Sequence, residues 1–143
     1  MTTDTQSRVL IVDDNQDAAD LLSELVAMRG FVTDTAYDGF MALDVALSFQ
    51  PDIVILDLGM PKFSGDEVAT MLRQVASLKD VFIVALTSWN DSEARALTKR
   101  TGFDLHLAKP VKVRELFAAL ELGLRARARV AGTSDDSLTC QEA

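Results

Sequence analysis

Short runs of apolar residues recur along the chain, and they fall into two kinds. Residues 9–12, 53–56 and 81–86 are wholly apolar, which is typical of strands covered on both faces of a sheet. Residues 31–36 and 104–108 mix apolar with polar positions, as strands at the edges of a sheet do. The pattern therefore predicts five strands, with the three apolar ones at the centre of the sheet.

Between these runs, apolar residues recur at the spacing of one helix face. The positions are Leu21, Leu22, Leu25 and Met28; Leu43, Ala46 and Leu47; Val68, Met71, Leu72 and Val75, preceded by a capping-box pair, Ser64 and Glu67; Ala94 and Leu97; and Val113, Leu116, Phe117, Leu120 and Leu124. Strands that alternate with helices imply a parallel sheet with helices on both faces. With the mixed strands outermost, we predict an α/β fold: a doubly wound, five-stranded parallel sheet of order 2-1-3-4-5, flavodoxin-like and of (βα)5 form.

Four of the predicted strands run directly into polar residues that suit chemistry. Asp13 and Asp14 follow the first strand, Asp57 follows the third, Thr87 the fourth and Lys109 the fifth. The carboxyl ends of parallel strands lie on one edge, and doubly wound sheets bind ligands there, between strands one and three. We therefore expect these five side chains to line one site.

The three carboxylates predict a divalent cation at that site. At a separation of about 4 Å and an effective dielectric near 20, two like charges repel by roughly 4 kcal/mol, against a typical folding stability of about 5–15 kcal/mol. Oxygen ligands with room for water favour Mg²⁺, with Mn²⁺ as a substitute. The alternative is that Asp13 and Asp14 cap the first helix while Asp57 begins a turn.

A carboxylate beside such a cation can attack phosphorus and form an aspartyl phosphate. Lys109 is a long, mobile point charge suited to a phosphoryl oxygen, and the Thr87 hydroxyl can donate to the same oxygens. Each residue has a plainer alternative: Lys109 as a solvated residue before a helix that starts at Pro110, and Thr87 as a β-branched residue packed in a strand. What favours a phosphoryl site is the whole set and its order along the chain.

Composition narrows the functional classes. A chain of 143 residues, 48% hydrophobic and 25% charged, suits one soluble domain, which we expect over residues 8–130 with flexible ends at 1–7 and 131–143. The net charge of −8 argues against direct binding of nucleic acid. The single cysteine, Cys140, can form no internal disulfide, and no apolar run resembles a signal peptide or reaches the roughly 20 residues of a membrane span. We therefore expect a cytoplasmic protein that does not enter the membrane.

Taken together, the motifs of this chain resemble the receiver domains of two-component response regulators, over roughly residues 8–129. The matching segments are Val12-Asp13-Asp14-Asn15, Leu56-Asp57, Met60-Pro61-Lys62-Phe63-Ser64-Gly65-Asp66-Glu67, Leu86-Thr87-Ser88 and Ala108-Lys109-Pro110. The resemblance implies that Asp57 accepts a phosphoryl group from a histidine kinase or a histidine phosphotransfer protein.

The same resemblance implies roles for the other residues of the site. Asp14, Asp57 and the backbone carbonyl of Gly59 would be Mg²⁺ ligands, with Asp13 acting through water. Lys109 would pair with Asp57 and then with the phosphoryl group, while Thr87 would bind that group and carry the signal outward. In such domains the Lys109–Pro110 bond is often cis.

Other positions are more open. His106 stands where the family usually has a Tyr or Phe that rotates as a switch; it would also respond to pH, and the alternative is a surface histidine on an edge strand. Gly59 and Trp89 occupy variable places where family members tune phosphoryl lifetime through water access, although Trp89 also suits a simple loop anchor. We expect the basic end of the last helix to be solvated, since helix C-termini favour cations; it comprises Arg125, Arg127 and Arg129.

The predicted function is a phosphoacceptor receiver of a two-component or phosphorelay system. We expect a stand-alone regulator that modifies only itself and turns over no external substrate. Phosphorylation would change the face formed by the fourth helix, fifth strand and fifth helix, which would bind a downstream protein; the chain would be a monomer or a weak, phosphorylation-dependent dimer. The alternatives are a receiver from a hybrid histidine kinase, an interaction module that never takes phosphate, a flavodoxin-like electron carrier, and a metal-dependent phosphatase with an aspartyl intermediate.

Overall fold

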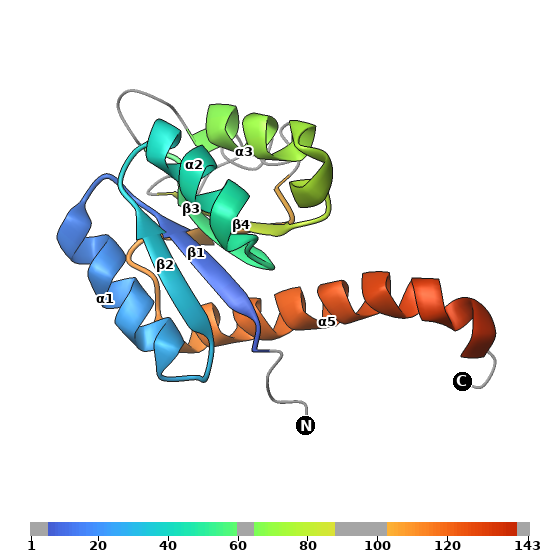
Figure 1. The fold of residues 1–143 in the computed structure, drawn as a ribbon. Helices are drawn as coiled ribbons and strands as arrows, with labels where there is room; N and C mark the ends of the chain where they lie inside the picture. Colours follow the sequence, from blue (N-terminus) through green and yellow to red (C-terminus); the bar gives the residue numbers. More distant parts are fainter. Residues whose placement is uncertain (1–5, 60–64, 88–102, 140–143) are drawn as a thin grey trace.

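The chain folds as a five-stranded parallel sheet with helices on both faces (Figure 1). The computed structural model describes residues 6–59, 65–87 and 103–139. The elements in chain order are β1 (Arg8–Val12), α1 (Gln16–Ala27), β2 (Val32–Ala36), α2 (Gly39–Phe49), β3 (Ile53–Asp57), α3 (Gly65–Gln74), the 3₁₀ helix η1 (Ala76–Leu78), β4 (Phe82–Thr87), β5 (Leu105–Ala108) and α5 (Val113–Thr139). The strand order β2-β1-β3-β4-β5 confirms the predicted fold class. The predicted fourth helix and Ser64 of the capping box lie outside the described residues.

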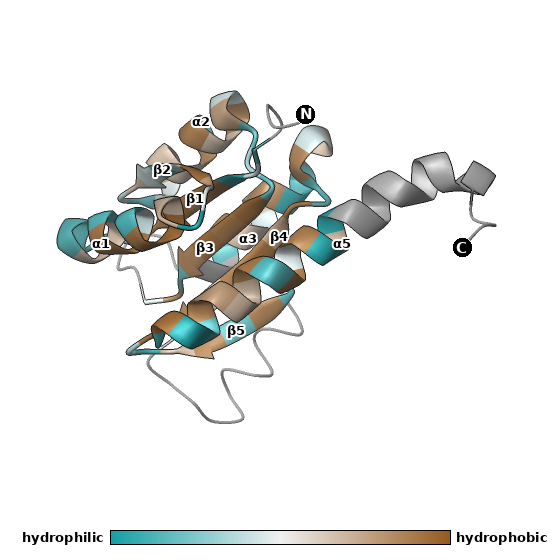
Figure 2. Cartoon of the chain, turned by 90° about the horizontal axis from the view of Figure 1, so that it is seen from below, coloured by the Kyte–Doolittle hydropathy of each residue, from teal (hydrophilic) through white to brown (hydrophobic). Residues whose placement is uncertain are grey.

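Alternate residues of the central strands pack against helices on opposite faces of the sheet. Leu10, Val54 and Ile83 face α2 and α3, whereas Val9 and Ile55 face α1 and α5. Figure 2 shows the result as hydrophobic residues (brown) along β3 and β4, with mixed surfaces on α1 and α5. The central strands are apolar throughout because both sides of each strand are buried.

α1 buries a slightly different face from the one predicted. Leu22 and Leu25 pack against the core as expected, but Leu21 is 58% exposed and Met28 is 77% exposed. The fully buried positions of the helix are Ala19 and Val26. These residues share one stripe with Leu22 because they lie three or four positions from it, whereas Leu21 points to the side of that stripe.

α5 is the longest helix, and it ends at Thr139, nine residues after the domain boundary that we expected at residue 130. Its core contacts come from its first half, at Leu116, Ala119 and Leu120. Alanine and arginine, which dominate residues 125–131, are strong helix formers, and an existing helix extends at little cost. Neither α5 nor any other described helix is long and apolar enough to cross a membrane.

Two arginines join helices to the edge of the sheet where the strands begin. Arg73 of α3 pairs with Asp104 at 2.9 Å, and Asp104 also accepts a hydrogen bond from the Ile83 N–H at 2.8 Å. Arg127 of α5 pairs with Asp52, which directly precedes β3. The expectation that Arg127 is merely solvated is therefore wrong, because the helix brings it against a carboxylate that lies 75 positions earlier in the chain.

Candidate functional site

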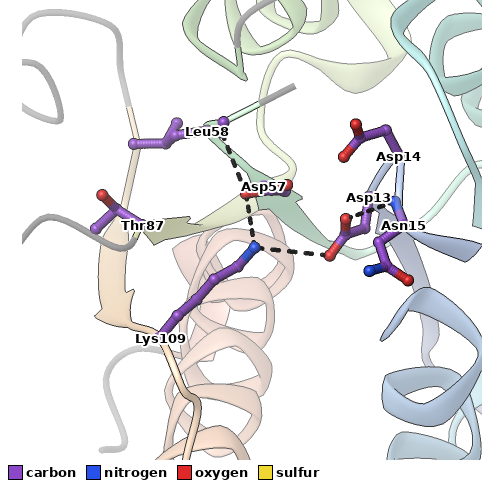
Figure 3. Close-up of a pocket in the computed structure, with 8 residues that line it drawn as sticks. Asp13, Asp14, Asn15, Asp57, Leu58, Thr87 and Lys109 are labelled. Carbon is purple, nitrogen blue, oxygen red and sulfur yellow. Dashed lines mark hydrogen bonds and ion pairs between the residues drawn. The ribbon is translucent and has the colours of Figure 1, made fainter. Parts of the chain in front are cut away.

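Four strands deliver polar side chains to a single pocket of about 430 Å³ at the carboxyl edge of the sheet (Figure 3). Asp13 directly follows β1, Asp57 ends β3, Thr87 ends β4 and Lys109 directly follows β5. The described residues that line the pocket are Asp13, Asp14, Asn15, Asp57, Leu58, Gly59, Thr87 and Lys109. The structure thus brings together the five side chains that the sequence placed at one site, and Gly59 with them.

Lys109 lies between two buried carboxylates. Its Nζ is 3.1 Å from Asp57 Oδ1 and 3.9 Å from Asp13 Oδ2. Asp57 is 4% exposed and Asp13 is 1% exposed, whereas the Lys109 side chain keeps 35% of its surface in solvent. The Lys109 N–H donates to the Thr87 carbonyl at 2.8 Å, which continues the β4–β5 pairing and fixes the base of the side chain. The ammonium therefore offsets negative charge that is otherwise costly to bury.

The Asp57 carboxylate has a second donor. The Gly59 N–H donates to Asp57 Oδ1 at 3.1 Å, a local contact in which an aspartate binds the backbone two residues on. One carboxylate oxygen thus meets an amide and an ammonium. These two contacts hold the carboxylate group in one orientation at the end of its strand.

Only one of the two carboxylate oxygens of Asp13 accepts a hydrogen bond from a described residue. The Asn15 N–H donates to Asp13 Oδ1 at 3.0 Å. Asp13 Oδ2 is buried and accepts no hydrogen bond from any described residue. Since buried polar atoms are rarely unsatisfied, this oxygen points to a ligand that completes the site.

The first helix is capped by Asn15, whose side chain accepts a hydrogen bond from the Ala18 N–H at 3.0 Å. The alternative in which Asp13 and Asp14 cap that helix is therefore wrong. The sequence carries a signal for this cap, because an asparagine just before an amphipathic run is a helix-start signal.

The surroundings of Asp13 favour its neutral form. Burial raises the pKa of Asp13 to about 6, and repulsion from Asp57 adds to the effect. The Asn15 N–H and the Lys109 ammonium act in the opposite direction but do not cancel it. Burial is therefore the main reason that the charged form of Asp13 is disfavoured, and the nearby charge of Asp57 adds to it.

The donor set fits a hard divalent cation. One carboxylate oxygen from each of Asp13, Asp14 and Asp57 lies within 4.8 Å of the others. Asp14 is exposed, so the cluster is open to water on its side. Three carboxylates with access to water suit Mg²⁺ or Mn²⁺, which prefer oxygen ligands and retain water.

The remaining predicted positions differ in how close they lie to this cluster. Thr87 is 2% exposed and stands at the end of β4 beside Lys109 and Asp57 in Figure 3. His106 is half-buried in β5, in register with Ala85, and is not among the described residues that line the pocket. Trp89 lies outside the described residues. The Lys109–Pro110 bond is cis, as the resemblance implied.

We predict that Asp13→Asn stabilises the metal-free protein at neutral pH. The pKa of Asp13 is higher in the folded chain, about 6, than its ordinary 3.8, so the folded state binds the proton more tightly. Wild-type stability at this site should therefore fall as the pH rises from about 4 to about 6, and the variant should lack this loss. The gain at pH 7 should be about 2–3 kcal/mol. Urea unfolding in the presence of a chelator, from pH 4 to pH 7, measures the difference in unfolding free energy between the variant and the wild type. A difference that does not change with pH would contradict the prediction.

The chain is similar to one well-described family. The sequence model of the response regulator receiver domain matches residues 9–121. The transcriptional regulatory protein PrrA of Mycobacterium tuberculosis is 35% identical over 135 residues, which are 94% of this chain and 57% of PrrA. The DNA-binding dual master transcriptional regulator RpaA of Synechocystis is 32% identical over 123 residues, 86% of this chain and 51% of RpaA. The chain thus spans about half the length of the curated relatives that it matches.

Solved structures of response regulators are also similar to this chain, over most of its length. The chemotaxis response regulator CheY4 of Vibrio cholerae superposes with a TM-score of 0.78 at 29% identity, covering 83% of this chain and 99% of CheY4. A putative response regulator from Chloroflexus aurantiacus superposes with a TM-score of 0.79 at 28% identity, covering 85% of this chain and 99% of that protein.

Proposed function

Because the chain belongs to the response regulator receiver family, we propose that it accepts a phosphoryl group on Asp57 in a Mg²⁺-dependent reaction. The observation that carries the proposal is the pairing of buried Asp57 with Lys109 at 3.1 Å, inside a cluster of three carboxylates. A single charged residue at a strand end has many explanations. A nucleophile, a cation site and an ammonium group in one pocket have few explanations other than phosphoryl transfer.

Each residue of the pocket has a part in the proposed reaction. Asp14, Asp57 and the Gly59 carbonyl would hold Mg²⁺, with Asp13 acting through water; when bound, the ion neutralises charge on the transferred oxygens. Asp57 attacks phosphorus, forming an O–P bond as the bond from phosphorus to the donor's leaving atom breaks. Lys109 then follows the charge from the carboxylate to a phosphoryl oxygen, and the Thr87 hydroxyl donates to another.

The proposed donor is a phosphohistidine on a histidine kinase or a phosphotransfer protein. In that case the P–N bond breaks, and the imidazole nitrogen leaves with the electron pair and takes up a proton. The chain then acts as a switch, because phosphorylation raises the population of a partner-binding state. The proposed output face combines β5 and α5 with residues 88–102, which are outside the described residues. Action as a stand-alone regulator, a role for His106 and a cytoplasmic location stay predictions.

Intact mass spectrometry tests this function. The wild-type protein is incubated with acetyl phosphate and Mg²⁺, and we expect a gain of one phosphoryl group that is absent when a chelator is added. Peptide mapping after borohydride reduction should locate the group on Asp57. A phosphoryl group on another residue, or no gain even with a phosphohistidine protein as donor, would overturn the proposal.

Two alternatives give different results in the same preparation. A metal-dependent phosphatase would turn over an added phosphate ester, whereas the proposed receiver should stop after modifying itself. An electron carrier would be coloured by flavin. The described residues that line the pocket include no aromatic side chain on which a flavin ring could stack, so the geometry does not favour that alternative.

A further inference from the structure

At the edge of the sheet opposite the pocket, Arg127 of α5 makes a set of polar contacts with residues that precede the strands. The Arg127 Nη2 atom is 3.5 Å from Asp52 Oδ1, and Nη1 donates to the Asp80 carbonyl at 3.0 Å. Asp52 precedes β3, and its second oxygen accepts a hydrogen bond from the Arg8 N–H of β1 at 2.9 Å. Asp80 lies just before β4. The Arg127 side chain therefore joins α5 to the residues just before β3 and β4, and Asp52 links this contact to the start of β1.

One turn earlier, at Gly123, α5 lies close against the sheet. A Cβ atom added at Gly123 would lie 2.8 Å from Ile53 Cδ1 and 3.0 Å from the Phe82 ring. A side chain at this position would force Ile53, Phe82 or the helix itself to shift, so glycine lets the helix lie this close to β3 and β4 without rearrangement. Gly123 and Arg127 are four residues apart and lie on the same face of α5. The helix is therefore held against the sheet in two ways: by close packing at Gly123 and by polar contacts at Arg127.

Beyond these points α5 continues past the edge of the sheet (Figure 1). Twelve residues of α5, 128–139, follow Arg127, and at 1.5 Å per residue they form an arm about 18 Å long. A swing of about 20° around Arg127 would therefore move the tip by about 6 Å. We propose that Arg127 is a positioning residue that fixes the direction in which this arm, residues 128–139, leaves the domain.

The chemistry of the contact makes that direction adjustable. The side chains of Arg127 and Asp52 are 33% and 31% exposed, so dissolved salt can screen their attraction. The hydrogen bond to the Asp80 carbonyl adds a second, directional contact that a planar guanidinium can make at the same time. The arm should therefore be well oriented at low ionic strength and less so at high ionic strength.

Distance measurements between two spin labels test the proposal. Labels at Ser48→Cys on α2 and Thr133→Cys on the arm, with Cys140→Ser to remove the native thiol, are measured by double electron–electron resonance. We expect one narrow distance distribution for the parent chain. Arg127→Ala and, separately, Asp52→Asn should lose this narrow peak, because each removes one partner of the same ion pair. Added salt should broaden the parent distribution in the same direction.

Arg125→Ala is the matched control. Arg125 lies two residues away on the same helix, and its recorded pairing is with Glu121 of α5 itself, at 3.9 Å. This variant should keep the narrow peak. Circular dichroism must show equal helix content in all variants, which separates a change of direction from loss of the helix. A narrow peak in both Arg127→Ala and Asp52→Asn, or equal broadening in Arg125→Ala, would overturn the proposal.

Discussion

Asp57→Asn is expected to abolish phosphoryl uptake from acetyl phosphate. The substitution keeps the size of the side chain and an oxygen that can accept from the Gly59 N–H, so the turn after β3 should survive. It removes the carboxylate that we propose as the nucleophile, and a neutral amide is a poor nucleophile toward phosphorus. Intact mass should show no gain in the variant under conditions that modify the wild-type protein fully.

The control for this prediction is Asp34→Asn. Asp34 is an exposed aspartate on the edge strand β2 and does not line the pocket, so its variant should be phosphorylated at the wild-type rate. If Asp57→Asn gained a phosphoryl group as fast as the wild type, the acceptor would be a different residue. The role assigned to Asp57 would then be wrong, although the fold would be unaffected.

Lys109→Ala should have the second largest effect. Its Nζ contacts Asp57 at 3.1 Å and Asp13 at 3.9 Å, and it is the one basic residue among the described residues that line the pocket. Without the ammonium, charge on the transferred oxygens loses a partner, and removal of one such group typically slows a reaction by about 10²–10³-fold. Time courses of phosphoryl gain at saturating Mg²⁺ measure the loss.

The same variant should be less stable without metal. The ammonium offsets two buried carboxylates, but the Lys109 side chain is 35% exposed, so solvent already screens part of the interaction. We therefore expect a loss of about 1–2 kcal/mol in urea unfolding. Lys112→Ala, an exposed lysine three positions later and outside the pocket, should change neither the rate nor the stability. An unchanged rate in Lys109→Ala would contradict the proposed role.

The strands of the sheet and most residues of the pocket could be predicted from short patterns in the sequence. Wholly apolar runs identified β1, β3 and β4 as central strands, because every side chain of a strand that is buried on both faces lies in the core. Once the strand order was known, the parallel arrangement placed Asp13, Asp57 and Lys109 at one edge. These conclusions need only patterns within short segments and one topological rule.

The partner that each polar atom meets, by contrast, depends on how the elements pack in three dimensions. It left Asp13 Oδ2 buried without a described hydrogen-bond donor, exposed Leu21 on α1, and joined Arg127 to Asp52 and Asp80. Periodicity reports the burial of a residue relative to its close neighbours in the chain. It carries no information about pairs such as Arg127 and Asp80, 47 positions apart, because their contact depends on how two finished elements pack against each other.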